Sequence, residues 1–181
     1  MNTTYLHRAK RQDNNEWVEG SLVHDPNLDV FDIFGFNYYS GENGREREEF
    51  SYRIIPETIG QYTGKEIAEN RITDLHCYEH MRKVFVDDVI VIYSVHYDDA
   101  DNLMRDVVAT VRVKWDEEYH MPFAECIKGS YGDISSECDI SYLEDGFDLP
   151  FTYFIEYMGN STSPFWDWEV IGNAHDNPEL L

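Results

Sequence analysis

The chain has 181 residues, and 36 Asp and Glu residues against 14 Lys and Arg give it a formal charge of −22 and an isoelectric point near 4.4. A hydrophobic content of 42% and an aromatic content of 15% are typical of folded proteins and exclude an intrinsically disordered chain. Because binding of DNA or RNA needs clustered Lys and Arg, the charge balance argues against direct contact with nucleic acid.

The N-terminal third reads as a series of short strands. We expect strands over residues 16–23, 30–39 and 51–55, the last ending at Pro56 because proline cannot continue a central ladder. The Gly- and Asn-rich residues 40–44 between two of these strands predict an exposed loop.

The next segment predicts the one helix of the chain. Between Gly64 and Lys83, apolar residues recur at spacings of mostly three: Ile67, Ile72, Leu75, Tyr78 and Met81. This spacing is typical of an amphipathic helix. We therefore expect a single helix within residues 65–82.

The longest β-like run covers residues 83–97, and its alternation changes phase at Asp87-Asp88, which predicts a bulge or bend. Further along the chain we expect one helical turn at 101–106 and strands at 106–115, 150–158 and 166–172. One face of the first of these strands collects Val107, Ala109, Val111, Val113 and Trp115. Residues 159–163 predict another exposed loop.

The C-terminus combines a β-rich pair, Val170-Ile171, with the turn signals Gly172-Asn173 and Asn177-Pro178. Two leucines close the sequence. This pattern predicts a last strand, a turn and a docked C-terminal hook.

Three segments of the chain are similar to those of one known family. Residues 8–20 contain Arg-Ala-Lys-Arg followed by a Trp and a Gly, residues 55–64 read Ile-Pro-Glu-Thr-Ile-Gly-Gln-Tyr-Thr-Gly, and residues 169–181 form the C-terminal pattern. In this order they resemble the YopX family of phage and prophage proteins. The chain departs from the family pattern after Gly64, and we place the matching strand at residues 83–90, so that residues 65–82 form an insertion.

The resemblance implies a small, strongly bent β barrel of the Src-homology-3 type from about residue 56 onward. Residues 1–55 would add N-terminal strands packed against it. We therefore expect a mainly β protein with minor α content and one inserted helix, built as a single compact unit over residues 1–181. The resemblance also implies a phage or prophage origin, and no reaction is firmly attached to the family.

Cellular location follows from what the sequence lacks. No segment is as long and apolar as a membrane span, and the N-terminus lacks the charged-then-apolar pattern of a signal peptide. Cys77, Cys126 and Cys138 are odd in number and irregularly spaced, which favours reduced thiols. We expect a protein of the host cytoplasm with no membrane contact.

Metal binding and catalysis find little support in the sequence. The nearest approach to a metal site is His76-Cys77-x-x-His80, whose two histidines would share a helix face, but no third ligand accompanies them. The chain contains no nucleophile elbow and no glycine-rich phosphate loop. We expect no bound metal, no cofactor and no enzymatic activity.

Two aromatic groups have alternative interpretations. Trp17, Gln61 and Tyr62 either line a ligand pocket or fill the core of a small β domain. Trp166 and Trp168 lie in a segment too apolar for a solvent loop, so they belong either to the core or to a homo-oligomer contact.

The acidic residues occur in clusters, which also allow two interpretations. They either form a solvated surface or imitate a phosphate backbone and occupy the basic nucleic-acid channel of a host enzyme. In the second case they would bind a host protein with a basic surface. The candidate residues for this surface are Asp98, Asp99, Asp101, Asp116, Glu117, Glu118, Glu144 and Asp145.

These observations favour a non-catalytic phage accessory protein that binds and modulates a host protein, with a counter-defence inhibitor as the more specific form. One alternative is a protein that sequesters a nucleotide-like signal in a pocket between subunits, using a basic patch of Arg45, Arg47, Arg53 and Arg71. Another alternative is a structural component of the virion.

Overall fold

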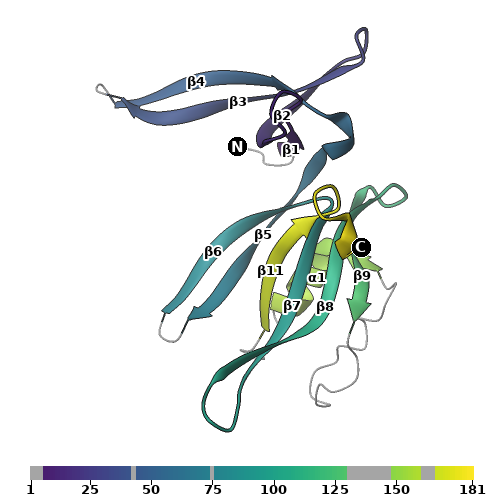
Figure 1. The fold of residues 1–181 in the computed structure, drawn as a ribbon. Coiled ribbons are helices and arrows are strands. Elements are labelled where there is room, and N and C mark those ends of the chain that lie inside the picture. The colour runs from purple at the N-terminus through teal and green to yellow at the C-terminus, as the bar shows by residue number, and fades with distance from the viewer. Residues whose placement is uncertain (1–5, 42–43, 74–75, 130–147, 160–165) are drawn as a thin grey trace. The chain divides into compact units, whose positions relative to one another are not determined.

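The computed structural model describes residues 6–41, 44–73, 76–129, 148–159 and 166–181 (Figure 1). The side chains of residues 41, 44, 68–80, 156–159 and 166 lie outside this description. In place of the expected single unit, the chain forms two compact units, Met1–Gly64 and Lys65–Leu181. The predicted mainly β class is confirmed, because strands form most of both units.

The first unit, unit 1, is an antiparallel sheet in which the first four strands are neighbours in chain order. The start of β5 continues the sheet by pairing with β1. The elements are β1 (Leu6–Lys10), β2 (Trp17–Asp25), β3 (Val30–Gly41), β4 (Gly44–Arg53), the short 3-10 helix η2 (Pro56–Thr58), and β5 (Gly60–Thr73), which continues into the second unit. The strands predicted at 16–23, 30–39 and 51–55 are confirmed, with β4 beginning earlier than expected.

One face of this sheet forms the core of unit 1. Directly opposed residues of antiparallel strands have side chains on the same face. The registers of the β1–β2, β2–β3 and β3–β4 pairs therefore gather alternate residues on one inner face. Ala9, Ile33 and Ile54 are buried there, and partly buried apolar side chains pack around them: Val18, Leu22, Phe31, Phe50 and Ile59.

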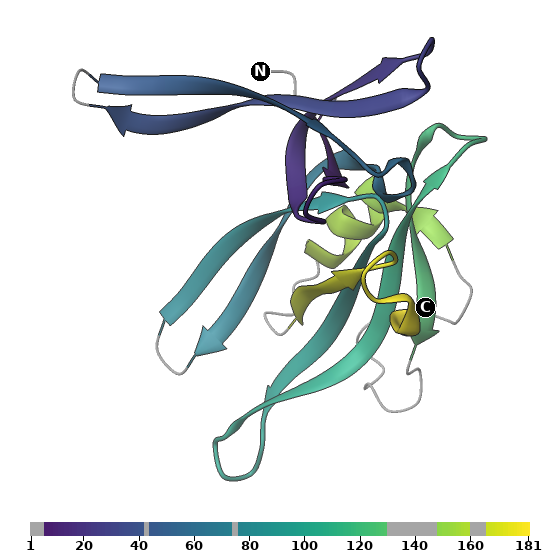
Figure 2. The ribbon, with the colours of Figure 1, turned by 45° about the horizontal axis from the view of Figure 1, so that its top comes forward.

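The β3–β4 hairpin extends past the rest of the unit 1 sheet (Figure 1, Figure 2). β3 pairs with β2 only over residues 30–34, whereas its pairing with β4 continues to Gly41. Residues 35–41 and 44–50 consequently form a two-stranded ribbon, which we call the arm. Residues 37–40 and 45–49 of the arm are all exposed, so both of its faces are available for contact along this part.

The second unit, unit 2, is a curled five-stranded antiparallel sheet in the order β10-β9-β8-β7-β11, together with the β5–β6 hairpin and one helix. This arrangement fits a small bent β barrel or roll. Ile67 and Val84 of the hairpin join the sheet residues in a single core. The elements are β6 (His76–Phe85), β7 (Asp88–Tyr97), β8 (Leu103–Asp116), β9 (Met121–Gly129), β10 (Asp148–Pro150), α1 (Phe151–Gly159), β11 (Trp166–Asn173) and the 3-10 helix η3 (Pro178–Leu180).

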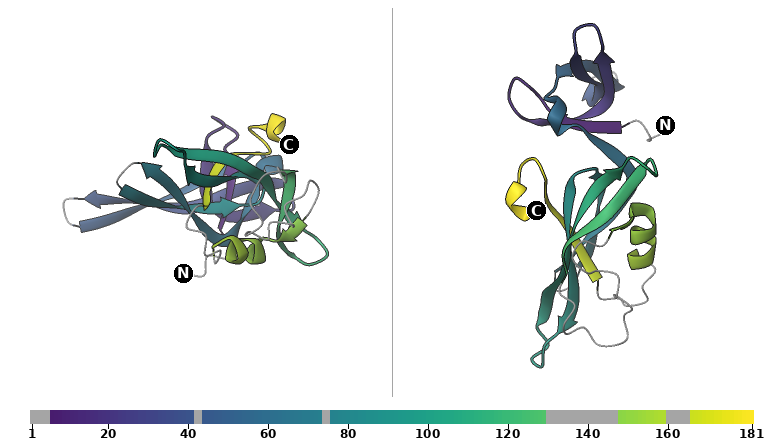
Figure 3. Two further views of the ribbon diagram at one scale, coloured as in Figure 1. Left: turned by 90° about the horizontal axis from the view of Figure 1, so that it is seen from below. Right: turned by 90° about the vertical axis from the view of Figure 1, so that its right-hand side faces the viewer.

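In two segments the structure has a different element from the one that the sequence predicted. Residues 65–73 and 76–82 belong to strands β5 and β6 instead of a helix, and residues 151–159 form α1 instead of a strand. Phe151 and Phe154 are fully buried on the inner side of α1, which lies beside the curled sheet (Figure 3). Neither α1 nor any other helix in the described ranges is long and apolar enough to cross a membrane.

The predicted single strand over 83–97 is in fact two strands joined by a tight turn. Asp87 adopts a left-handed conformation with φ 73°, and its N–H donates to the carbonyl of Val113 at 2.6 Å. The buried carboxylate of Asp88 accepts a hydrogen bond from the N–H of Phe85 at 2.9 Å. The phase change in the sequence therefore marks a chain reversal and not a bulge.

The predicted helical turn at 101–106 is also wrong, because β8 already begins at Leu103. A register shift opposite Ile92 and Tyr93 changes the alternation of β8. Val108 takes the interior position, while Val107 is 53% exposed instead of facing the core as expected.

The C-terminal hook expected from the sequence is confirmed. The side-chain oxygen of Asn173 accepts hydrogen bonds from the N–H groups of His175 and Asp176 at 2.9 and 3.0 Å. The N–H of Ala174 donates to the carbonyl of Asp87 at 2.9 Å, which fastens the hook to the β6–β7 turn. The C-terminal sequence pattern thus encodes turn geometry and docking.

Candidate binding surfaces

The residues predicted to line a ligand pocket do not come together. Gln61 is paired with His7, and Trp17 is paired with Lys10, three positions further along β1. Because successive side chains of a strand point to opposite faces, Trp17 and Gln61 lie on opposite faces of the sheet. Tyr62 is buried, in agreement with the core interpretation.

Trp17 lies on the outer face of unit 1 between two cationic side chains. The guanidinium carbon of Arg8 is 5.0 Å from the centre of the Trp17 ring, and the ammonium nitrogen of Lys10 is 5.5 Å from it. Both distances fall within the range of cation–π attraction. Trp17 therefore stabilises two like charges on neighbouring positions of the surface.

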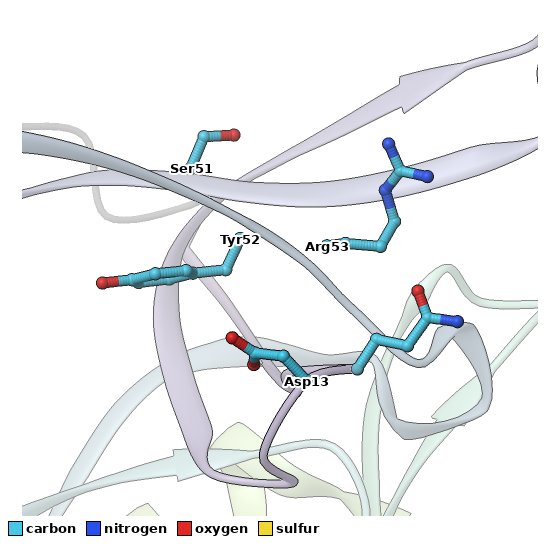
Figure 4. A pocket seen from close by; sticks show the side chains of 5 residues that line it. Asp13, Ser51, Tyr52 and Arg53 are labelled. Atoms are coloured by element: carbon cyan, nitrogen blue, oxygen red, sulfur yellow. The ribbon is translucent and has the colours of Figure 1, made fainter.

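A hollow of about 280 Å³ in unit 1 is lined by Gln12, Asp13, Ser51, Tyr52 and Arg53. Figure 4 shows Ser51 and Arg53 leaving β4 on one side and Tyr52 on the other, so their polar groups do not converge. Its charged side chains are engaged in ion pairs, because Asp13 accepts from Arg11 and Arg53 donates to Asp32 at 2.8 Å.

The Arg11–Asp13 ion pair has the expected electrostatic effect on both groups. The hydrogen bond from Arg11 lowers the pKa of Asp13, and the same bond raises the pKa of Arg11. The guanidinium of Arg11 also lies 3.7 Å from the centre of the Tyr52 ring. The charged groups at the hollow are thus already paired with each other, and the hollow lacks the convergent polar groups of a ligand site.

The weak metal candidate loses its structural basis. His76, Cys77 and His80 lie on strand β6 and not on a helix. Four residues of a strand span about 13 Å, which is too far for His76 and His80 to bind one ion together. Their side chains lie outside the described residues, and among the described residues no three His, Cys, Asp or Glu gather as a metal site.

Trp168 belongs to the core of unit 2. It is buried, and its ring meets that of Phe154 edge to face at a centroid distance of 6.3 Å. Of the two predicted locations for Trp168, core or oligomer contact, the structure supports the core. The side chain of Trp166 lies outside the described residues.

The acidic residues of the predicted partner surface lie mainly in two turns. Asp98 accepts hydrogen bonds from the N–H groups of Ala100 and Asn102 at 2.9 and 2.8 Å and from the Asn102 side chain. Asp116 accepts from the N–H groups of Glu118 and Tyr119 at 2.9 and 2.8 Å. Both carboxylates therefore stabilise the turns in which they lie, whereas Asp99, Asp101, Glu117 and Glu118 are exposed.

The two acidic turns are not one patch. They lie at the two ends of β8, whose 14 residues span roughly 40 Å. Glu144 and Asp145 lie outside the described residues.

The net charge is divided unequally between the two units. Residues 1–64 contain 11 acidic and 6 basic residues, a charge of −5, and residues 65–181 contain 25 acidic and 8 basic residues, a charge of −17.

The outer face of the arm brings together a different set of side chains. Arg47 lies directly opposite Tyr38, and Phe36 lies opposite Glu49, so these residues and Arg45 share one face. The guanidinium of Arg45 lies 4.9 Å from the centre of the Tyr38 ring, and that of Arg47 lies 4.8 Å from the Phe36 ring. We call these four residues, Phe36, Tyr38, Arg45 and Arg47, the arginine–aromatic surface.

Both arginines of this surface are exposed, and Tyr38 is 50% exposed. Within the described part of the chain, neither arginine forms an ion pair or a side-chain hydrogen bond. Each guanidinium lies over an aromatic ring within the range of cation–π attraction, and its N–H groups can still donate to acceptors. The surface is therefore suited to binding carboxylates or other planar anions.

Part of this surface was predicted from the sequence. Of the four arginines that the sequence offered as a basic patch for a nucleotide-like ligand, Arg45, Arg47 and Arg53 share the outer face of β4. Arg53, however, is paired with Asp32, and the side chain of Arg71 lies outside the described residues. The aromatic partners were missed, although Phe34, Phe36 and Tyr38 alternate in the sequence of β3.

No protein-family model, curated protein or solved structure matches this chain. The resemblance to YopX proteins stays a prediction that rests on the three sequence segments described above.

Proposed function

We propose that this chain is a non-catalytic accessory protein of phage or prophage origin that binds and modulates a host protein in the host cytoplasm. The observation that carries this proposal is the exposed arginine–aromatic surface of the arm. Tyr, Trp and Arg are the residues most enriched among those that dominate binding energy in protein interfaces. An exposed pair of stacked arginines on a projecting ribbon fits such an interface.

The electrostatics of unit 1 support a protein partner. Its net charge of −5 leaves the arginines in a locally mixed environment, with Glu49 and Asp32 on the same face. Alternating charges of both signs give specificity between proteins more than they give strength. The arm also offers two faces of different character, because Glu46 and Glu48 occupy the face opposite to the arginines.

The test is affinity capture from a lysate of the bacterial host, followed by mass spectrometry, with three forms of the full chain. The double variant R45Q/R47Q removes the two charges of the surface, and E46Q/E48Q makes a matched change on the opposite face of the same strand. We expect one host protein to be captured by the wild type and by E46Q/E48Q and lost with R45Q/R47Q. Capture of the same proteins by all three forms would contradict the proposal.

A second candidate function is favoured by the charge of unit 2. Its −17 over 117 residues is the charge expected of a protein that competes with nucleic acid for a basic channel, as in a counter-defence inhibitor. Because the two acidic turns lie at opposite ends of β8, a protein that imitates nucleic acid through both turns would contact its partner at two separate points. The partner of this unit would have a basic surface.

A further inference from the structure

We infer that the arginine–aromatic surface of the arm receives an extended segment of the partner protein with carboxylate side chains at alternate positions. This inference rests on the proposed function and specifies the chemistry of the partner. It follows from the spacing of the two arginines, from the placement of each guanidinium over an aromatic ring and from the charges around them.

Spacing is the first argument. Arg45 and Arg47 are separated by one residue on a β-strand, so their side chains leave the same face about 7 Å apart. Side chains at alternate positions of an extended segment repeat at the same interval. A segment lying along β4 can thus present one carboxylate to each arginine without bending.

The placement of each guanidinium over a ring is the second argument. The ring of Tyr38 and the ring of Phe36 each support one guanidinium at 4.9 and 4.8 Å. This stacking restricts the long arginine side chains before a partner arrives, which lowers the entropy lost on binding. The in-plane N–H groups can then form paired hydrogen bonds with a carboxylate. The exposed part of the Tyr38 ring adds apolar contact area beside these bonds.

Charge favours a protein segment over nucleic acid. Affinity for nucleic acid depends on the number of phosphates that are neutralised, and the outer face of the arm carries only two unpaired cations beside the acidic Glu49. A second copy of this chain is also disfavoured, because it would bring a further charge of −22, whereas a short segment brings only the few carboxylates that the arginines bind. A short segment with one carboxylate for each of these two arginines matches what the face offers.

The test measures direct binding by fluorescence anisotropy at low ionic strength. The probes are three labelled oligomers: a 12-residue peptide of alternating Glu and Thr, the corresponding peptide of Lys and Thr, and a 12-nucleotide oligo-dT. We expect the Glu peptide to bind the wild type and E46Q/E48Q, and to bind R45Q/R47Q at least tenfold more weakly. Circular dichroism of each variant verifies that the fold is intact.

Several results would overturn the inference. Equal binding of the Glu peptide to all three proteins, or no binding, would show that the arginines do not select carboxylates. Tighter binding of oligo-dT would assign the surface to single-stranded nucleic acid, and a sedimentation coefficient that rises with concentration and falls in R45Q/R47Q would assign it to a second copy. The proposed function is tested separately. If the Glu peptide does not bind but capture of a host protein from the lysate still depends on Arg45 and Arg47, the inference is wrong and the proposed function stands.

Discussion

Gly20 lies on β2 in close contact with β3. A Cβ atom at this position would meet the carbonyl oxygen of Phe34 and lie 2.7 Å from Cγ2 of Ile33, a fully buried core residue. Backbone and core atoms cannot move aside cheaply, so a methyl group there forces the two strands apart. The Gly of the N-terminal motif is thus explained by packing.

We predict that Gly20→Ala lowers the free energy of unfolding by about 1–3 kcal/mol, the usual cost of overpacking. Gly64→Ala is the control, because Gly64 has φ +80° and no atom within 4 Å of a new Cβ. It should cost only about 1 kcal/mol, from the left-handed conformation. Urea denaturation of both variants measures the difference, and a Gly20→Ala protein as stable as the wild type would contradict the packing argument.

Asp98 shows how a single carboxylate is held by its turn. The hydrogen bond from the Asn102 side chain, together with backbone N–H groups of Asn102 and Ala100, lowers its pKa. Because the folded-state pKa is depressed, this stabilisation is complete above the ordinary pKa of Asp and is lost as the pH falls through the folded-state value. The β7–β8 turn should therefore loosen only in acid.

We predict that Asn102→Ala moves the pKa of Asp98 upward, towards its ordinary value, because the strongest donor is removed. NMR titration of the Asp98 carboxyl carbon in the wild type and in the variant measures this directly. An Asp98 titration that is identical in wild type and variant would mean that the backbone donors alone set the pKa.

At the scale of elements, α1 is held to unit 2 by two phenylalanines on one side. Phe151 and Phe154 are buried against the sheet, whereas Tyr153 on the other side is 57% exposed. We predict that Phe154→Ala costs about 3–5 kcal/mol, because it removes a large buried ring and its contact with Trp168. Tyr153→Ala is the matched control and should cost less than about 1 kcal/mol. Similar losses in the two variants would disprove this orientation of the helix.

The spacing of apolar residues led to a wrong secondary-structure prediction in two segments, and α1 is one of them. Phe151, Phe154 and Ile155 follow the i, i+3, i+4 spacing of a helix face directly after Pro150, a signal that the aromatic and β-branched composition of the segment obscured. The segment after Gly64 shows the reverse case: its apolar spacing of mostly three matches a helix face and not the period of two of a strand, yet residues 65–73 and 76–82 form strands. Tertiary packing of Ile67 and Val84 into the sheet decided the outcome there.

The arm illustrates a different limit of sequence reasoning. The alternation of Arg45, Arg47 and Arg53 places them on one face of a strand, and this much was predictable. Their aromatic partners depend on the register of β3 against β4, which puts Arg47 opposite Tyr38. Register is a property of a strand pair, so the stacked surface could not be derived from either strand alone.

At the scale of the whole molecule, charge is distributed very differently between the two units. Residues 65–181 carry −17 of the total −22, and their exposed acidic groups include the turns at both ends of β8. If this charge serves only solubility, removing part of it should not affect a partner. If unit 2 occupies a basic channel on a host enzyme, the exposed carboxylates of these turns contribute to affinity.

We predict, for the second case, that reversing Asp99, Glu117 and Glu118 to Lys abolishes binding to that partner. Asp98 and Asp116 are left unchanged because they hold the turns together. The control is an equal change of net charge in unit 1, with Glu46, Glu48 and Glu57 reversed to Lys. Exposed charge changes usually cost little stability, so both proteins should fold.

Salt and competing DNA complete the test of the acidic surface. Exposed charges are screened beyond about 10 Å at 0.1 M ionic strength, so the affinity of a mimic for its partner should fall steeply as salt is added. DNA should compete for the same site, and the unit 1 control should bind like the wild type. A channel that binds phosphates binds them through its positive charge, so its affinity for a mimic depends on salt and on competing DNA. If the affinity for the partner changes neither with salt concentration nor with added DNA, the acidity of unit 2 serves solubility.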